Sequence, residues 1–372
     1  MRLTKRVYFW GAESVLLLFI LFSCKQNTTV TYVSQNYKGE DYRLALNDSS
    51  IIEDWIYDVK QNKLAIWNSS IYSIDIYNLD SRSFENRIFL SEEGPFGIGN
   101  VESIAFLDCG ITAIDPIKKV RLNISFETNK KEIIRLVNLE NQKTLADYNF
   151  NIVHEFSSKP KIDSNHSVWP ITPKEDFLSK EYYSHDVLLV DDSKTVGTWP
   201  NSYQKYYYGL LGEPSLSYSE KLIFLSFPIE ERITVFDYQG KEQSGFMLSS
   251  SEFRTFRGMD RQNPDLQKES NMTITETWFL KTIYHENKLI RFEKEAQDLK
   301  DVEGKLNSKL FGKWKIIWKN LSGNDTIFTM GLPEKELFLP ISFPYKNGVL
   351  IKKINDENED FADFVYINLD AI

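Results

Sequence analysis

Six short stretches of this sequence share one pattern, an apolar or aromatic run that ends in an asparagine or an aspartate. The six are IYNLD (76–80), LVNLE (136–140), LVDDS (189–193), VFDYQ (235–239), WKNLS (318–322) and YINLD (366–370). From Asn78 to Asn368 the mean spacing is about 58 residues, and a regular spacing of this order marks a repeat fold. An Asx side chain can hydrogen-bond to the backbone two residues further on and start a hairpin turn. We therefore interpret each copy as a strand that leads into a turn.

A second pattern, a turn followed by an apolar run, occurs once before each of these copies. Its members are QNKLAIW (61–67), DCGITAI (108–114), SNHSVWPI (164–171), SEKLIFL (219–225), ENKLIRF (286–292) and KNGVLI (346–351). Repeats that carry about four strands each are typical of β-propeller blades. The interleaved patterns predict an all-β, six-bladed β-propeller over residues 41–372, in which each blade contains strands A to D from the axis outwards.

Five copies are followed by a candidate for the outermost strand D, namely FENRIFL (84–90), TLADYNF (144–150), KTVGTW (194–199), GFMLS (245–249) and TIFTMGL (326–332). The sixth copy has none, since the sequence finishes with FVYINLDAI (364–372). Two N-terminal segments are strand-like, TVTYVSQ (29–35) and YRLALND (42–48). We predict that one of them pairs with residues 363–369 as the fourth strand of blade 6, because a closed ring leaves no exposed sheet edge.

Insertions are expected between strands B and C of blades 2, 3 and 5, at residues 127–132, 173–186 and 293–312. The insertion in blade 5 has apolar residues at the spacing of an amphipathic helix, namely Leu299, Val302, Leu306 and Leu310. The one in blade 3 begins at Pro173 and continues with acidic residues, which suits the first turn of a helix. We therefore predict short helical insertions in blades 3 and 5. The polar stretch 254–273 is expected to be a long connection between blades 4 and 5.

Residues 1–23 are organised like a bacterial lipoprotein signal peptide. Three basic residues precede an apolar run over 15–22, which is shorter than the ~20 residues that a membrane-spanning helix needs. The run ends in Leu-Phe-Ser-Cys and resembles a lipobox, in which Cys24 becomes the lipidated first residue. An ordinary signal peptide, an uncleaved anchor and a disulfide between Cys24 and Cys109 are the alternatives. If Cys24 is the lipidated first residue, residues 24–40 form a tether and a candidate closing strand.

A loop with the sequence EGPFGIG (93–99) completes a family resemblance. With its lipobox and six degenerate blades, the chain resembles the uncharacterised propeller-type lipoproteins of Bacteroidota, a domain family of unknown function related in shape to TolB-like six-bladed propellers. The resemblance implies the fold and, through a palmitate-bearing anchor, an outer-membrane address, since Lys25 stands where Asp would signal inner-membrane retention. It leaves open the periplasmic or the surface face of that membrane. Asp325-Thr326-Ile327 also resembles the O-glycosylation signal of exported Bacteroidota proteins, which marks Thr326 as a candidate.

The sequence carries no strong enzyme signature. It has no G-x-x-x-x-G-K, G-x-G-x-x-G, H-E-x-x-H or G-x-S-x-G motif. His154, Glu155, Asp163 and His166 could be drawn as a metal cluster, but their spacing matches no ligand template. The formal charge of −9 argues against nucleic acid as a partner, because phosphate binding needs a basic surface. We expect neither a cofactor nor a bound metal, and we assign no catalytic residue.

The candidate ligand-binding residues lie in connections between blades, which gather on the face around a propeller's channel. They are Glu93 and Phe96 in the loop 93–99, Tyr207 in KYYYGLLGEP (205–214), and Arg254 and Arg257 after blade 4. Aromatic rings together with arginines suit the binding of a sugar or a peptide. The alternative is that the glycines only shape the crossover between blades and that the rings pack in the core.

These patterns favour an envelope lipoprotein that acts as a non-enzymatic binding or scaffold module, as a monomer with a protein or glycan partner. The missing catalytic motifs and the aromatic, glycine-rich connections motivate this hypothesis. The alternative is a hydrolase or lyase with a site at the channel mouth, which requires acids and histidines that converge on one face. A structural assembly subunit is a third alternative, and it would present a large apolar patch on a blade edge.

The lipoprotein hypothesis makes a direct prediction. Replacing the acceptor thiol, Cys24→Ala, is expected to abolish labelling with radioactive palmitate and to release the protein from membranes, because no thiol remains at the lipobox. The control is Cys109→Ala, which changes the only other cysteine and should leave labelling intact. Full labelling of the Cys24→Ala variant would contradict the hypothesis.

Overall fold

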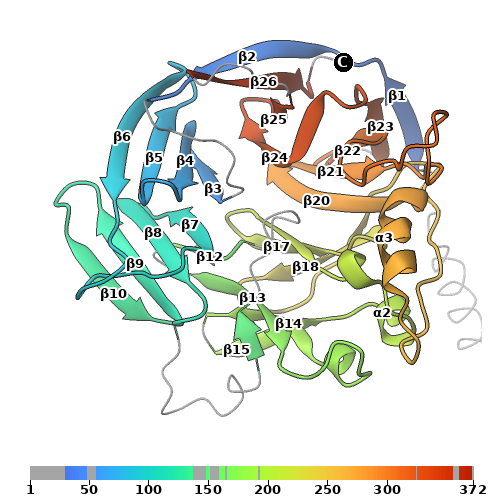
Figure 1. Ribbon diagram of the computed structural model, residues 1–372, viewed down its shortest axis with the longest axis horizontal. Coiled ribbons are helices and arrows are strands. Elements are labelled where there is room, and N and C mark those ends of the chain that lie inside the picture. Colours follow the sequence, from blue (N-terminus) through green and yellow to red (C-terminus); the bar gives the residue numbers. More distant parts are fainter. Residues whose placement is uncertain are drawn as a thin grey trace, which may run out of the picture.

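The computed structural model describes residues 30–47, 56–136, 148–150, 159–163, 166–191, 193–323, 325–354 and 360–370. Within these residues, six small and mainly antiparallel sheets stand in a ring about one axis (Figure 1). The fold is therefore a six-bladed β-propeller, and the predicted fold class and blade number are confirmed. The signal sequence, Cys24, His154 and Glu155 lie outside the described residues.

Each blade is a meander, and the first three blades follow one another along the chain. Blade 1 contains β3 (Tyr57–Lys60), β4 (Lys63–Asn68), β5 (Ser73–Asn78) and β6 (Ser83–Phe89). Blade 2 contains β7 (Ser103–Phe106), β8 (Gly110–Asp115), β9 (Val120–Ser125) and β10 (Lys131–Arg135). Blade 3 contains β11 (Tyr148–Phe150), β12 (Lys161–Ile162), β13 (Ser167–Pro173), β14 (Asp186–Val190) and β15 (Lys194–Thr198). Strands β11 and β12 pair with opposite ends of β13 and share the innermost position.

The remaining three blades complete the ring, and the last two recruit strands from the N-terminus. Blade 4 contains β16 (Ser215–Tyr218), β17 (Leu222–Ser226), β18 (Arg232–Asp237) and β19 (Phe246–Met247). Blade 5 contains β20 (Trp278–His285), β21 (Lys288–Lys294), β22 (Trp314–Asn320), β23 (Thr326–Gly331) and, outermost, β1 (Thr31–Gln35). Blade 6 contains β24 (Leu337–Tyr345), β25 (Gly348–Lys353), β26 (Phe361–Asn368) and, outermost, β2 (Gly39–Ala45).

The meander sorts the loops onto two faces of the ring. Successive strands of a blade run in opposite directions, so the B–C turns and the connections between blades meet at one end of the inner strands. The A–B and C–D turns meet at the other end. We call these two ends the connection face and the turn face.

Five of the six Asx positions lie in the described residues, and each of them ends or directly follows strand C as the repeat predicted. The sixth, Asn138, lies outside the described residues. The Oδ1 atoms of Asn78, Asp237 and Asn368 each accept the backbone N–H two residues further on, at 2.9, 3.0 and 2.9 Å. These side chains therefore start turns, and their recurrence reflects the hairpins of the blades.

Blade 2 is where the predicted strand assignment is wrong. Its strand C is β9 and its strand D is β10, so residues 127–132 belong to the turn between C and D and are no insertion between B and C. Residues 148–150, expected in strand D of blade 2, pair with β13 of blade 3. Strand β10 has the sequence KEIIR, with two adjacent apolar residues between charged ones, and it is partly exposed. Its sequence therefore lacks the apolar alternation that identifies a strand.

The helix predicted over residues 293–312 is also wrong. This segment is an irregular hairpin with one bridge between Lys300 and Leu306, and its turn contains Gly304 at a φ of 80°. The Asp301 carboxylate accepts the backbone N–H groups of Glu303 and Lys305 at 2.9 and 2.8 Å and so stabilises a turn. Val302 and Leu306 are exposed, and an apolar stripe without a partner surface does not hold a short helix together.

Helical structure occurs instead in the connections around blade 4. The insertion of blade 3 has a single 3₁₀ turn (Tyr182–Ser184), whereas α2 (Asn201–Lys205) follows blade 3 and α3 (Leu266–Thr275) follows blade 4. Helix α3 lies within the connection that the sequence predicted only as a polar loop. Its N-cap is Asp265, whose Oδ1 accepts the N–H groups of Gln267 and Lys268 at 2.9 and 3.1 Å.

The N-terminal segment closes the ring along its rim (Figure 1). Strand β2 runs antiparallel to β26, from Gly39 opposite Ile367 to Ala45 opposite Phe361, and forms the fourth strand of blade 6. This confirms that one of the two N-terminal segments pairs with the final strand. The other segment, β1, adds in parallel to β23 of blade 5, with Thr31 opposite Thr326.

Tyr42 on β2 joins blade 6 to blade 1. Its side chain is buried, and its ring centroid lies 5.5 Å from that of Tyr345 and 6.2 Å from that of Phe364. From blade 1, the guanidinium of Arg82 lies 4.6 Å from the ring centroid, and the carbonyl oxygen of Leu79 accepts the hydroxyl of Tyr42. One residue of the closing strand thus contacts both sides of the seam where the two ends of the ring meet.

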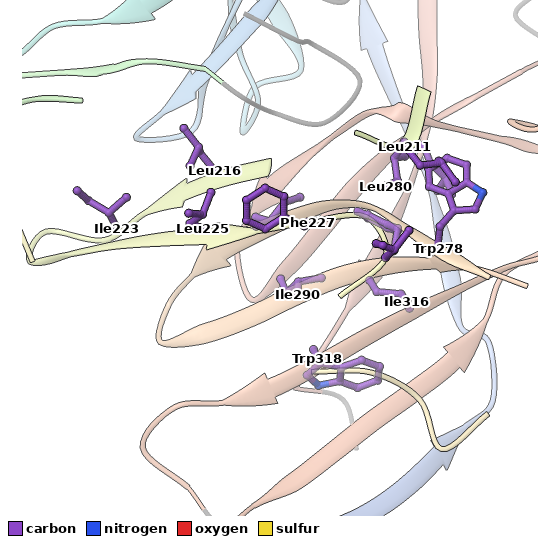
Figure 2. Close-up of a cluster of buried hydrophobic side chains, with 14 of the residues drawn as sticks. Leu211, Leu216, Ile223, Leu225, Phe227, Trp278, Leu280, Ile290, Ile316 and Trp318 are labelled. Atoms are coloured by element: carbon purple, nitrogen blue, oxygen red, sulfur yellow. The ribbon is translucent and has the colours of Figure 1, made fainter. Parts of the chain in front are cut away.

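Apolar side chains fill the space between neighbouring blades. Figure 2 shows part of one large buried cluster, to which Leu216 and Leu225 of blade 4 and Ile290 and Ile316 of blade 5 all contribute. All four side chains are essentially inaccessible to solvent. Burying each such side chain contributes about 1.5–3 kcal/mol relative to exposure, so these interfaces supply most of the driving force for ring assembly.

A buried arginine adds a polar link between the same two blades. The guanidinium of Arg291 on β21 donates to the carbonyl oxygens of Phe227, Glu230 and Leu248, each at 3.0 Å. It also lies 3.5 Å from the ring centroid of Phe279. The planar guanidinium presents several N–H groups in fixed directions, and a lysine ammonium cannot reproduce this set.

Loss of the Tyr42 ring should weaken the closed propeller. Tyr42→Ala is expected to lower the free energy of unfolding by about 3 kcal/mol, because it removes a buried aromatic side chain at the seam. Tyr32→Ala on β1, where the side chain is 44% exposed, is the matched control and should change it by less than ~0.5 kcal/mol. Chemical denaturation measures both, and equal effects would contradict the role of Tyr42 at the seam.

Arg291 should tolerate no conservative replacement. Arg291→Lys is expected to cost about 3 kcal/mol of unfolding free energy, because several buried carbonyl oxygens lose their donors. Arg232→Lys changes an arginine on β18 whose side chain is 57% exposed, and it should have no measurable effect. A small effect at Arg291 would show that apolar packing alone holds blades 4 and 5 together.

Candidate functional site

A recess of about 560 Å³ opens on the connection face above blades 3, 4 and 5. Its walls come from the insertion of blade 3, the connection between blades 3 and 4, helix α3 and the start of β20. Six of the lining residues are aromatic: Phe177, Tyr182, Tyr183, Trp199, Tyr207 and Trp278. Five are charged: Lys174, Glu175, Glu213, Glu269 and Lys309. We call this cavity the aromatic recess.

The rings of the aromatic recess hold one another in place. The ring of Trp199, just after β15, lies 5.7 Å from Tyr182 and 5.1 Å from Tyr183, measured between centroids. The ring centroid of Phe177, at the rim, lies 5.7 Å from that of Tyr207 in the opposite wall, so the rim and this wall are in contact. Aromatic pairs at such distances pack favourably, and most of these rings are also part of the buried core. The walls are therefore formed before any ligand arrives.

Glu269 fixes the wall that α3 contributes. Its Oε1 accepts the backbone N–H of Leu210 at 3.1 Å, and its Oε2 accepts the hydroxyl of Tyr207 at 3.3 Å. Burial and the charge of Glu269 raise the pKa of Tyr207, so this hydroxyl stays protonated. Gly209 makes the approach feasible, because it has a φ of 56° and any Cβ there would lie 2.2 Å from the Glu269 carboxyl carbon.

Arg261 supports the recess from behind. Its guanidinium lies 3.9 Å from the ring centroid of Tyr183 and donates to the carbonyl oxygens of Ser179 and Tyr206 at 3.0 and 3.1 Å. It also donates to the carbonyl oxygen of Tyr203. These contacts join the blade 3 insertion to the connection between blades 3 and 4, so the two walls form one rigid unit.

Two polar groups of the recess have no hydrogen-bond partner among the described residues. One is the indole Nε1–H of Trp199, whose side chain is 3% exposed. The other is Oε2 of Glu175, whose Oε1 lies 3.5 Å from Nε2 of His185. A buried polar group without a partner is costly, and a few such groups in a concave apolar site are typical of ligand recognition.

Of the residues predicted from the sequence, the structure places Tyr207 in the recess. Glu93 and Phe96 lie between blades 1 and 2, where Gly94 has a φ of 96° and the Phe96 side chain is 44% exposed. Arg254 donates to the carbonyl oxygen of Phe253 at 2.7 Å, and the guanidinium of Arg257 lies 4.9 Å from the ring centroid of Tyr206. These four are on the connection face but outside the lining of the recess. Thr326 begins β23, and Cys24 lies outside the described residues.

Sequence reasoning missed Glu175, Trp199 and Glu269. Glu175 stood within the predicted blade 3 insertion, and Trp199 was assigned only to a strand end. The signal for Glu269 was present, because Pro264 and Asp265 begin a helix that contains it. That these residues face one cavity follows only from the placement of three blades.

No metal-binding cluster is apparent in the part of the chain that the structure describes. No group of three or more His, Cys, Asp and Glu side chains there is arranged to hold a metal ion. Asp163 and His166 are half of the metal cluster considered from the sequence, and the backbone N–H of His166 donates to Oδ1 of Asp163 at 2.8 Å. Among the same residues, no helix is both long and apolar enough to cross a membrane.

Comparison with known proteins identifies the fold. No family model matches the chain, and no curated protein matches it. The structure is similar to that of a member of the DUF4221 family from Bacteroides vulgatus ATCC 8482, with a TM-score of 0.70 and 14% identity over 88% of this chain and 96% of that one. A protein of Bacteroides fragilis NCTC 9343, described as a candidate exported protein, superposes with a TM-score of 0.56 and 14% identity over 91% and 100% of the two chains. These likenesses establish a shared fold.

Proposed function

We propose that this chain is a non-enzymatic binding module that takes the end of a glycan into the aromatic recess. The observation that carries this proposal is the pair of unsatisfied polar groups, Trp199 Nε1–H and Glu175 Oε2, on two residues that line a cavity with six aromatic side chains. One is a hydrogen-bond donor and the other an acceptor, as sugar hydroxyl groups require. Rings supply apolar contact area for the C–H faces of a sugar at low entropic cost.

The size and charge of the recess also suit this ligand. Its volume of about 560 Å³ lies within the range of small-molecule sites and leaves room for a short oligosaccharide end. Three carboxylates and two ammonium groups line it, so its charge is nearly balanced. A strongly charged ligand would leave part of this set uncompensated, whereas a neutral sugar would not.

We further propose that the protein works in the cell envelope, held to the outer membrane through a lipid on Cys24. The lipobox at residues 21–24 supports this location, and the resemblance to propeller-type lipoproteins of Bacteroidota is consistent with it. The structural likeness to a Bacteroides protein described as a candidate exported protein points the same way. A glycan-binding module is useful at that place, because glycans are abundant outside the cell.

A hydrolase or lyase is the second candidate function. Cleavage of the bound ligand would distinguish such an enzyme from a binding module. Glu175, Glu213 and Glu269 bring several carboxylates to one cavity, which is the residue type that glycoside hydrolysis requires. If a bound oligosaccharide is cleaved at a rate that a single change such as Glu213→Gln abolishes, the protein is an enzyme. Recovery of the intact ligand after prolonged incubation supports a binding module.

The proposal is tested by replacing residues of the recess one at a time. A glycan array selects a ligand, and calorimetry then measures its affinity for each variant. Trp199→Phe keeps the ring but removes the donor, and it is expected to weaken binding about tenfold, or ~1.4 kcal/mol. Phe177→Ala removes a half-exposed ring from the rim and should weaken binding at least as much.

Phe96→Ala is the matched control for Phe177→Ala. Both rings lie on the connection face and are about half exposed, but only Phe177 lines the recess. Unchanged affinity for Phe96→Ala is expected. The opposite result, in which only the Phe96 variant loses binding, would move the site to the loop between blades 1 and 2 and would refute the recess as the binding site.

A further inference from the structure

A second cavity, of about 590 Å³, lies on the axis of the propeller. Its lining comes from the inner strands of all six blades and runs to their ends at the A–B turns, as in residues 57–60, 216–220 and 282–284. It therefore opens toward the turn face, opposite to the aromatic recess. We call it the axial channel, and we propose that it binds a small organic carboxylate through the ammonium group of Lys159.

The argument begins with the hydrogen bonds of Lys159. Its Nζ lies 3.4 Å from the ring centroid of Tyr57 and donates to the carbonyl oxygen of Tyr57. An ammonium group has three donors, and the described residues offer this one hydrogen-bond acceptor. Two donors of Lys159 are therefore available to a ligand in the channel.

The neighbouring lysines each have more hydrogen-bond or ion-pair partners than Lys159. On the other side of Tyr57, Nζ of Lys281 donates to the Tyr57 hydroxyl at 3.1 Å and to the carbonyl oxygens of Pro340 and Ser342 at 2.8 and 2.9 Å. Toward the turn face, Lys60 pairs with Asp108 at 3.1 Å, and Lys161 pairs with Asp163 at 3.5 Å. Lys60 also donates to the carbonyl oxygen of Leu107 and Lys161 to that of Ser219, each at 3.1 Å, so Lys159 has the fewest acceptors among the lysines described at the axial channel.

Two lysines and one carboxylate lie close to Tyr57 at the inner end of the channel. Lys159 and Lys281 bring two ammonium groups to Tyr57, and Asp58 brings one carboxylate, which already accepts the backbone N–H of Phe106 at 2.7 Å. Burial lowers the pKa of Lys159 to about 8, and burial together with the charge of Lys159 lowers the pKa of Lys281. Burial is the largest cause of both shifts, and a carboxylate bound beside Lys159 would stabilise its charged form.

The walls of the axial channel favour an organic anion over an inorganic one. Besides Tyr57, rings of Phe106, Tyr218, Tyr284 and Phe343 line it. These surfaces offer apolar contact to a carbon skeleton and nothing to the hydration shell of a free inorganic ion. The shared chemistry is thus a carboxylate attached to a body that can lie against rings, whether an aromatic acid or a sugar acid.

The first experiment measures binding of matched probes to the purified full chain by calorimetry. Benzoate is expected to bind at least tenfold more tightly than benzamide, which has the same shape without the charge. Glucuronate against glucose gives the same comparison for a sugar acid and tells which kind of body the channel prefers. Equal affinity for benzoate and benzamide, or binding of inorganic phosphate as tight as that of the preferred carboxylate, would overturn the proposal.

The second experiment assigns the binding to Lys159. Lys159→Met keeps the length of the side chain and removes its charge, and it should reduce benzoate affinity at least thirtyfold. Lys60→Met, which removes a lysine paired with Asp108 in the same channel, should change it less than threefold. Phe177→Ala should leave benzoate binding intact, so that a failure of the aromatic recess as a glycan site is distinguishable from a failure of this proposal.

The third experiment uses the protein without substitutions, so it tests the proposal even if the Lys159 variant does not fold. Amine-specific acetylation followed by peptide mass spectrometry reports the reactivity of each lysine. Benzoate should protect Lys159 and leave Lys305, which is highly exposed, unprotected. Acetylation of Lys159 at the same rate with and without saturating benzoate would refute the assignment.

Discussion

The pairing of β2 with β26 is the constraint on which the rest of this structure depends. It joins residues more than three hundred positions apart, as the pair of Arg43 with Asp363 shows, so it closes a loop that contains almost the whole chain. Closure converts six sheets with open ends into a ring in which each blade has two neighbours. The seam is strengthened by Tyr42, which contacts blade 1 as well as blade 6. Without this seam, blades 1 and 6 would each expose an apolar face.

The ring in turn explains why both cavities exist and why they face opposite ways. The aromatic recess is built from B–C insertions and inter-blade connections, which a meander delivers to one end of the ring. The axial channel is built from the last residues of the inner strands and opens at the other end. A rigid ring holds both sites at fixed geometry, because buried links such as Arg261 and Arg291 tie connections and blades together. The two cavities therefore lie on opposite faces of one rigid ring.

Polar groups in the interior of this propeller divide into two kinds. Arg291 and Lys281 donate to backbone carbonyl oxygens of neighbouring blades, and their hydrogen bonds are largely complete within the protein. Trp199 and Lys159 keep donors that the described residues do not use, and each of them stands in a cavity. The first kind holds blades together, and the second kind marks the places where we propose that ligands bind.

The sequence by itself determined the architecture, because turn chemistry and strand alternation act over a few residues and recur in each blade. Asn78, Asp237 and Asn368 start turns wherever they stand, and the need to pair the last strand predicted a closing strand near the N-terminus. The sequence pattern gave a wrong prediction in two places. The apolar spacing of Val302 and Leu306 predicted a helix, but these side chains are exposed and have no surface to pack against. The charged edge strand β10 lacks the alternation by which strands are recognised. Only the tertiary structure decided which side chains share a cavity. Glu175, Trp199 and Glu269 come from separate connections, and Lys159 and Lys281 from separate blades, so their meeting depends on how the ring closes.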